Sequence, residues 1–116
     1  MGQADCIFCR IAAGEVNANV VHTDDDTVAF RDINPQASTH VLVIPRRHIP
    51  SVNAIEDADA ELVGKLYRVA AAIAREDGVA TSGYRLVMNN GPDAGQSVDH
   101  IHLHVLGGRS LAWPPG

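Results

Sequence analysis

The chain has 116 residues and a formal net charge of −5, and 46% of its residues are hydrophobic. This length predicts a single domain over residues 1–116, with the composition of a globular protein. The acidic balance argues against nucleic-acid binding, which requires a basic face. No apolar run approaches the ~18 residues of a membrane span, and the start of the chain lacks the apolar core of a secretion signal. We therefore expect a soluble cytoplasmic protein with no nucleic-acid or membrane partner.

The first half of the chain predicts a short helix followed by antiparallel strands. Residues 6–13 are expected to form the helix. Residues 20–23 and 27–31 flank an acidic tip and predict a β-hairpin. Residues 40–44, with the sequence HVLVI, predict a buried strand that ends at Pro45, because proline cannot donate to a sheet.

The second half predicts one long helix and two more strands. Residues 57–77 form the helix, with an apolar stripe at Leu62, Leu66, Val69 and Ile73. Residues 84–88 and 100–106 predict strands on either side of a glycine-rich loop over residues 89–99. Strands dominate and no βα alternation repeats, so we expect an α+β fold with an antiparallel sheet.

The last predicted strand contains HIHLHV, in which three histidines alternate with three aliphatic residues. Side chains alternate between the two faces of a strand. The aliphatic residues would therefore face the core, and His100, His102 and His104 would share the opposite face. Three histidines on one face could be a polar outer surface, a metal site of neutral imidazoles, or a nucleophile with supporting donors.

Cys6 and Cys9 form a C-x-x-C pair near the N-terminus. Such a pair can bind zinc, act as a redox dithiol, or be two buried thiols. The redox interpretation expects a strand before the pair, and the sequence predicts none there. Zinc needs two further ligands, and six histidines are available. We expect zinc, in a closed and therefore structural site. The histidines are His22, His40, His48, His100, His102 and His104.

Three further groups of residues fit a nucleotide ligand. In the loop GPDAGQSV, Gly91 and Gly95 would leave backbone N–H groups accessible to a phosphate and Ser97 would add a hydroxyl, although such a loop can also be a simple turn. Asp32, at a strand end, could accept hydrogen bonds from a ribose or form a turn. Several apolar residues could line a slot for a base or belong to the core. They are Phe8, Ile11, Val16, Phe30 and Ile33.

These motifs resemble the histidine-triad (HIT) superfamily, whose signature is His-φ-His-φ-His-φ-φ, where φ is apolar. The segments FCRIAAGEV, FRDINPQASTHVLVIPRRHI, NNGPDAGQSVDHIHLHVLGGR and WPPG are similar to its nucleotide-binding (HINT) branch, in a bacterial form that has the C-x-x-C pair. The resemblance covers nearly the whole chain. It implies a HIT-like α+β fold, with an antiparallel sheet of about five strands, one long helix and a short N-terminal helix. It also implies a homodimer that joins through the long helix and the last strand, with Trp113 in a tail that reaches across the dimer.

The resemblance further implies a purine nucleoside phosphoramidase, which hydrolyses AMP-amine compounds through a nucleotidyl-histidine intermediate. His102 would be the nucleophile, His104 would contact a phosphate oxygen, and His100 and His40 would orient the neighbouring imidazoles, with Ser97 near the phosphate and leaving group. The implied nucleotide-binding positions are Phe8, Phe30, Asp32, Ile33, Asn89, Gly95, Gln96, Ser97, His102 and His104.

Relatives with the cysteine pair, including the galactose-1-phosphate uridylyltransferases, bind zinc, and by this resemblance the ligands would be Cys6, Cys9, His48 and His100. No acidic magnesium motif is present, so no catalytic metal is expected. Three rival functions stay open: a dinucleoside polyphosphate hydrolase or phosphorylase, a non-catalytic nucleotide-binding regulator, and a tris-histidine metal enzyme. The WPPG tail and the short chain favour the phosphoramidase.

Overall fold

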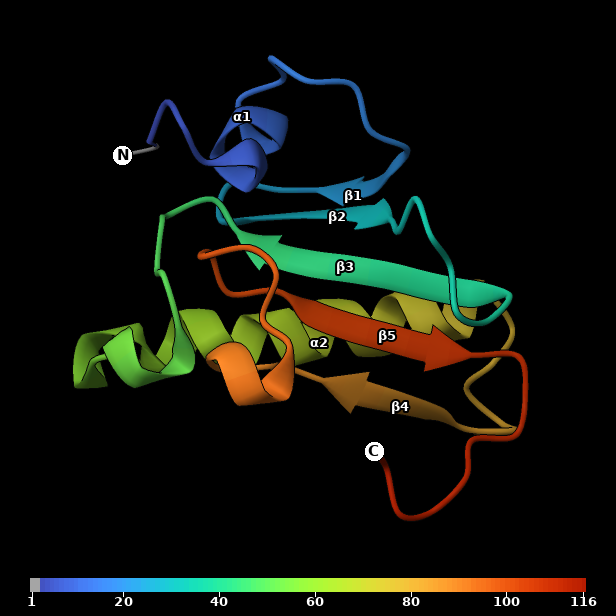
Figure 1. Cartoon of the computed structure of the whole chain (residues 1–116). Coiled ribbons are helices and arrows are strands. Elements are labelled where there is room, and N and C mark those ends of the chain that lie inside the picture. Colours follow the sequence, from blue (N-terminus) through green and yellow to red (C-terminus); the bar gives the residue numbers. More distant parts are fainter. Residues whose placement is uncertain (1–2) are drawn as a thin grey trace.

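Five antiparallel strands form the central sheet of the computed structural model, which describes residues 3–116 (Figure 1). Their order across the sheet is β1-β2-β3-β5-β4, so β1 and β4 are the edges and the last strand of the chain is an inner one. The strands are β1 (Val20–Thr23), β2 (Thr27–Arg31), β3 (Thr39–Pro45), β4 (Tyr84–Val87) and β5 (Leu103–Gly107). The predicted antiparallel α+β fold is confirmed, and the β1–β2 hairpin lies at the predicted residues.

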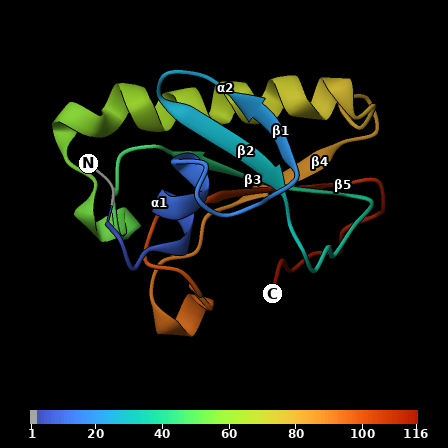
Figure 2. The ribbon, with the colours of Figure 1, turned by 90° about the horizontal axis from the view of Figure 1, so that it is seen from above.

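Two helices cover opposite faces of this sheet (Figure 2). The short helix α1 (Ile7–Ala12) lies within its predicted span. The long helix α2 (Ala60–Glu76) follows a 3-10 turn (Asp57–Asp59), where the sequence predicts continuous α-helix. This turn is held by the buried carboxylate of Asp59, which accepts a hydrogen bond from the backbone N–H of Glu56 at 2.9 Å. Two more 3-10 turns span Val52–Ala54 and Pro92–Ala94. None of the helices described is both long and apolar enough to cross a membrane.

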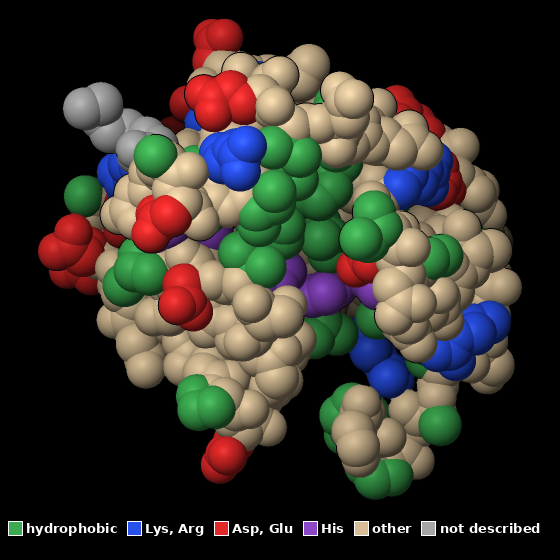
Figure 3. All heavy atoms as spheres, turned by 45° about the horizontal axis from the view of Figure 1, so that its top comes forward, with side chains coloured by type: hydrophobic (Ala, Val, Ile, Leu, Met, Phe, Trp, Pro, Cys, Tyr) green, Lys and Arg blue, Asp and Glu red, His purple; other side chains and the backbone are tan. Residues whose placement is uncertain are grey.

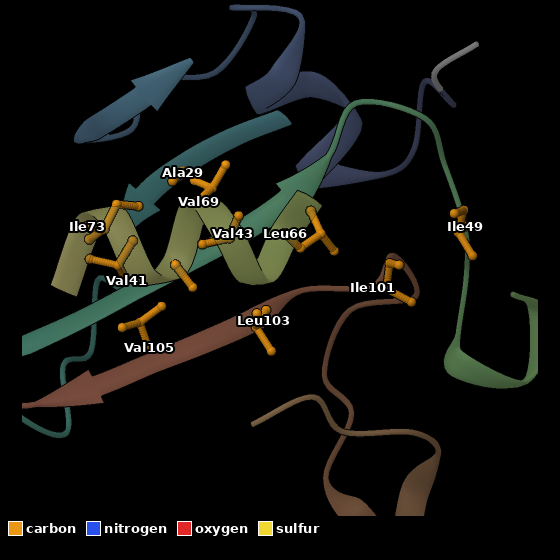
Figure 4. Close-up of a cluster of buried hydrophobic side chains, with 11 residues drawn as sticks. Ala29, Val41, Val43, Ile49, Leu66, Val69, Ile73, Ile101, Leu103 and Val105 are labelled. Atoms are coloured by element: carbon orange, nitrogen blue, oxygen red, sulfur yellow. The ribbon is translucent and has the colours of Figure 1, made fainter. Parts of the chain in front are cut away.

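The main hydrophobic core lies between α2 and one face of the sheet (Figure 4). Three residues of the predicted stripe on α2 are buried in it, and Leu62 packs at its margin. The aliphatic residues of the histidine run also belong to this core, as their alternation predicts. Its members are Ala29, Val41, Val43, Ile49, Leu66, Val69, Ala70, Ile73, Ile101, Leu103 and Val105.

A second core lies on the opposite face, where α1 packs against β2 and β3. It explains why every residue of β3 is buried, since both faces of that strand are covered. The histidine face of the run is also covered, so His100 and His102 are buried and only His104 is partly exposed. The members of this second core are Cys6, Phe8, Cys9, Val28, Phe30, Leu42 and Ile44.

The strand of the histidine run begins at Leu103, three residues later than the prediction. The ladder between β3 and β5 ends at the Val43–Leu103 pair. Two residues further along β3 lies Pro45, which has no N–H to continue the ladder. Residues 100–102 instead bond to the segment after β3, with the N–H of Ile101 donating to the Ile49 carbonyl at 2.8 Å. The alternation of side chains therefore continues beyond the end of the strand.

Candidate functional site

Strands β3 and β5 bring His40 and His104 together across the sheet. The ladder pairs His40 with Leu106 and Leu42 with His104, so the two histidines are diagonal neighbours on one face. His40 Nε2 lies 2.9 Å from His104 Nδ1. The rings of His102 and His104 are also close, with their centroids 5.1 Å apart. Figure 3 shows histidine side chains in a hollow of the surface, bordered by hydrophobic side chains.

The tautomer of His102 follows from a single hydrogen bond. Its Nδ1 lies 2.8 Å from the backbone carbonyl oxygen of His100. A carbonyl oxygen only accepts, so Nδ1 must be the protonated nitrogen. In the neutral ring the other nitrogen, Nε2, then has a free lone pair. The backbone thus holds this imidazole in the form required of a nucleophile.

A chain of hydrogen bonds gives His104 the opposite tautomer. The backbone N–H of Gln36 donates to His40 Nδ1 at 3.0 Å, so the proton of neutral His40 is on Nε2. That proton faces His104 Nδ1 at 2.9 Å, with the Asp32 carboxylate 3.4 Å from the same Nε2. His104 Nδ1 therefore accepts, and its own proton is on Nε2. His104 offers a donor where His102 offers a lone pair.

The same protons argue against a metal ion between Asp32, His40 and His104. One ligand atom from each of these residues lies within 4.8 Å of the others. However, a metal at His40 Nε2 would require the proton to move to Nδ1, which faces the Gln36 N–H donor. This group is therefore a hydrogen-bond relay.

Both imidazoles of this relay are neutral at neutral pH. The pKa of His104 is lowered to about 4, mainly by burial and also by possible positive charge on His102 and His40, while Asp32 opposes the shift. Burial also lowers the pKa of His40, again against the effect of Asp32. A neutral His104 can still donate from Nε2, but it does not contribute a full positive charge.

We expect Asp32→Asn to lower the pKa of both His40 and His104 further. The carboxylate stabilises the imidazolium form of each ring, so its loss favours the neutral form. The measurement is a pH titration of the histidine ring nitrogens by NMR, in which the midpoint of His104 should fall below about 4. Asp25→Asn, at the exposed tip of the β1–β2 hairpin, is the matched control. A rise in either midpoint on Asp32→Asn would contradict the expectation.

A second cluster joins Cys6, Cys9, His48 and His100, and its four ligand atoms all lie within 4.8 Å of one another. His100 Nδ1 is 3.4 Å from Cys6 Sγ and 3.5 Å from Cys9 Sγ. His48 Nδ1 is 3.3 Å from Cys9 Sγ. The structure therefore brings together the four residues that the resemblance implies as zinc ligands.

The protonation of His100 fits a metal at this cluster. Its Nε2 lies 2.8 Å from the Pro45 carbonyl and must donate to it, so the lone pair of Nδ1 faces the two sulfurs. Burial lowers the pKa of His100 to about 4, which keeps the ring neutral. Two thiols and two imidazoles match the closed tetrahedral set that zinc prefers. Burial also raises the pKa of the Cys9 thiol, so a metal ion is needed to hold it as thiolate at neutral pH.

Members of the cluster line two different clefts. Cys9 lines a cleft of about 1230 Å³ between α1, the tip of the β1–β2 hairpin and α2. Cys6 and His48 line a smaller cleft of about 370 Å³, together with Ser97 and Asp99. Ser97 thus lines the same cleft as Cys6 and His48.

The glycine-rich loop differs from its predicted role. The N–H groups of Gly91 and Gly95, expected to be free for a phosphate, both donate within the loop, to Gln96 Oε1 at 2.9 Å and to the Pro92 carbonyl at 3.1 Å. The amide nitrogen of Gln96 donates to the carbonyls of Pro50 and Val98. Gln96 therefore braces the loop. A glycine pattern alone cannot show this, because the partners are an amide side chain and backbone carbonyls.

The apolar residues expected around a base are divided between two environments. Phe8 and Phe30 are buried, with ring centroids 5.4 Å apart, and Phe8 also contacts His102 edge-on at 5.0 Å. Phe8 thus packs against the ring of His102, and Phe30 packs against Phe8. Ile33 is 100% exposed, one residue after Asp32. Asn89 follows β4, whose register with β5, extended by two residues, would place it opposite His102.

Comparisons with known proteins agree with this geometry. Residues 13–111 match the HIT domain family. An uncharacterized HIT-like protein of Synechococcus elongatus is 48% identical over 112 residues, which are 97% of each chain.

Two solved structures are similar. A HIT family hydrolase from Legionella pneumophila has a TM-score of 0.95 and 50% identity, covering 97% of this chain and 100% of its own. A Zn-bound histidine triad family protein from Mycobacterium smegmatis has a TM-score of 0.78 and 30% identity, covering 91% of this chain and 76% of its own.

Proposed function

The chain belongs to the HIT domain family, and we propose that it is a hydrolase that cleaves purine nucleoside 5'-phosphoramidates to the nucleoside monophosphate and an amine. The observation that carries this proposal is the pair of opposite tautomers, with a lone pair on His102 Nε2 and a proton on His104 Nε2 in neighbouring rings. The description of the Legionella pneumophila relative as a hydrolase supports the class of reaction.

The proposed reaction has two displacements at phosphorus. The lone pair of His102 Nε2 attacks the α-phosphorus, the P–N bond to the amine breaks, and the leaving nitrogen takes up a proton from solvent. Water then attacks the same phosphorus and gives up a proton to solvent, the P–Nε2 bond breaks, and AMP is released with neutral His102 restored. The Nε2–H of His104 donates to a phosphate oxygen in both steps, and the Ser97 hydroxyl is a second donor. Splitting one displacement into two lowers each barrier.

The nucleoside would occupy the side of the site formed by Asp32 and Ile33. The Asp32 carboxylate already accepts from the Asn34 N–H at 2.8 Å, and its remaining lone pairs can accept from ribose hydroxyls. A fully exposed isoleucine beside it supplies an apolar surface for a base. Phe8 and Phe30 are buried against each other, and Phe8 also contacts the ring of His102.

We propose that Cys6, Cys9, His48 and His100 hold a structural zinc ion. The support is the donor set and the lone pair of His100 Nδ1, together with the description of the Mycobacterium smegmatis relative as Zn-bound. A zinc ion with four protein ligands has no open position for a substrate, so it stabilises the fold and takes no part in the displacement.

We also propose a homodimer, with one change to the expected interface. The backbone of β5 is paired on both sides, so the last strand cannot extend the sheet into a second copy. β4 is an edge strand and is free to do so. On α2, Tyr67 is 46% exposed and offers an apolar contact.

The rival enzymes make different demands on the three histidines. A tris-histidine metal site needs all three rings on one ion, but the His100 ring lies with the thiols and His102 Nδ1 donates to a carbonyl. This geometry disfavours that function. A dinucleoside polyphosphate hydrolase would use the same nucleophile, so only the choice of substrate distinguishes it.

The test is to follow AMP release from adenosine 5'-phosphoramidates and from a diadenosine polyphosphate. Reactions stopped in alkaline denaturant should yield an AMP adduct on the peptide that contains His102, since phosphohistidine bonds are labile in acid. Faster release from the phosphoramidate is expected. Preference for the polyphosphate would change the substrate class, and absence of both adduct and AMP would contradict the enzyme.

A further inference from the structure

One peptide group orients the proposed nucleophile. The carbonyl of His100 accepts the Nδ1–H of His102 at 2.8 Å. The N–H of the same peptide group, on Ile101, donates to the Ile49 carbonyl at 2.8 Å. The orientation of this peptide group therefore depends on both hydrogen bonds. The tautomer of His102 depends on this orientation, because the carbonyl must point at Nδ1 to accept its proton.

The thiol cluster is connected to that peptide through the last residue of β3 and the segment that follows it. Residues 45–49 hold His100 through the Pro45 carbonyl, hold Ile101 through the Ile49 carbonyl, and include the cluster member His48. Residues 100–102 lie outside the regular β3–β5 ladder. Their position relative to residues 45–49 thus rests on these bonds and on the packing of Ile49 and Ile101 in the main core.

The cysteine helix forms a second connection. Phe8 lies between Cys6 and Cys9 in the chain, and its ring contacts His100 at 5.9 Å and His102 at 5.0 Å between centroids. The position of α1 therefore determines what the buried side of His102 packs against. Three segments meet at the cluster, namely α1, residues 45–49 and residues 100–102. Phe8 of α1 contacts His102, the third segment includes it, and residues 45–49 bond to His100 and Ile101, the two residues before it.

We propose that the Cys6–Cys9–His48–His100 cluster positions the nucleophile, so that metal occupancy determines how firmly His102 is held in its reactive tautomer. With no ion, the cluster is joined by sulfur–nitrogen contacts of 3.3–3.5 Å, which are weak hydrogen bonds. Ligand bonds of ~2.0–2.3 Å would lock the three segments together. Cys6, Cys9 and His48 are then positioning residues, and the ion does not contact the substrate. The rate effect rests on the proposed function, but the tautomer effect does not.

The test compares three variants with the wild type. His48→Ala removes a ligand, His48→Cys replaces it with another zinc ligand, and His22→Ala removes a histidine of β1 that pairs with Asp24. We measure zinc content, the His102 Nδ1–H resonance by proton–nitrogen NMR, AMP affinity and kcat. His48→Ala should lose zinc, lose the Nδ1–H resonance to solvent exchange, and lose about 10-fold in kcat with little change in AMP affinity. His48→Cys and His22→Ala should resemble the wild type.

A zinc-free His48→Ala protein that keeps the resonance and the kcat of the wild type would overturn the proposal. If that variant does not fold, the same readouts are taken on wild type stripped by a chelator and then reloaded with zinc. Global loss of the backbone amide spectrum on stripping would also overturn it, in favour of a purely structural site. If the wild type does not hydrolyse phosphoramidates, the proposed function fails, but the resonance still decides whether the cluster orients His102.

Discussion

Replacing His102 by alanine is expected to abolish hydrolysis of a nucleoside phosphoramidate and to leave the affinity for AMP nearly unchanged. His102 Nε2 carries the lone pair that attacks, because the backbone carbonyl of His100 keeps the proton of the ring on Nδ1. No other group of the site can form the same covalent intermediate. Loss of a catalytic nucleophile lowers kcat by about 10⁴-fold or more. Binding should persist because Asp32, Ile33 and His104 are retained. Steady-state kinetics and AMP titration measure the two effects.

His104→Ala provides the contrast and His22→Ala the control. His104 contributes a hydrogen-bond donor rather than a bond to phosphorus, so its loss should cost about 10²-fold in kcat. His22 lies in β1, away from the site, and its loss should change neither quantity. Near-normal turnover by His102→Ala would exclude the covalent mechanism. Equal losses for the His102 and His104 variants would mean that donation, and not attack, limits the rate.

Wild-type protein purified without a chelator is expected to contain about one zinc ion per chain, and Cys9→Ala almost none. Cys9 Sγ lies near the nitrogens of both His48 and His100, so its removal takes away the atom at the centre of the cluster. Because the ion binds only the folded chain, its loss lowers the free energy of unfolding. Elemental analysis measures the zinc, and thermal unfolding with and without added zinc measures the stability.

Two outcomes would contradict the zinc proposal. Equal zinc content in Cys9→Ala and wild type would place the ion elsewhere, with the partly buried His22–Asp24 pair as the first alternative to examine. A melting temperature of the wild type that is unchanged by stripping would mean that the cluster is two buried thiols beside two histidines. His22→Ala, which keeps all four ligands, should match the wild type in both measurements.

Much of the fold could be predicted because its signals are local. The hairpin strands flank an acidic turn, the α2 stripe has a helical period, and the histidine run alternates as a strand does. The end of the last strand at Leu103 could not be predicted in this way. It depends on Pro45, which lies across the sheet in β3 and has no N–H to donate to the chain that faces it.

The residues of the candidate site could be predicted from the sequence, but the ring nitrogen that carries the proton in each histidine could not. The resemblance named His40, His100, His102 and His104. His100 lies in the thiol cluster, His40 and His104 lie in the relay, and the ring of His102 lies beside that of His104. The tautomers, however, are set by backbone groups of Gln36, Pro45 and His100, which a pattern of side chains in the sequence does not reveal. Likewise, the N–H groups of Gly91 and Gly95 look free in the sequence because their partners appear only when the loop closes.

The residue proposed to donate to the phosphate and the residue proposed to contact the base lie in different surroundings. His104 is in the inner strand β5, and Ile33 is on the surface. This strand has a bonded neighbour on each side and a helix over each face of its sheet. Such a segment opens only when the whole domain unfolds, so its amides should be among the slowest to exchange with solvent. Ile33 is on the surface, where substitutions cost little stability. Evolution could therefore change the preferred nucleoside through surface residues such as Ile33, while almost any change near His104 would also disturb the core.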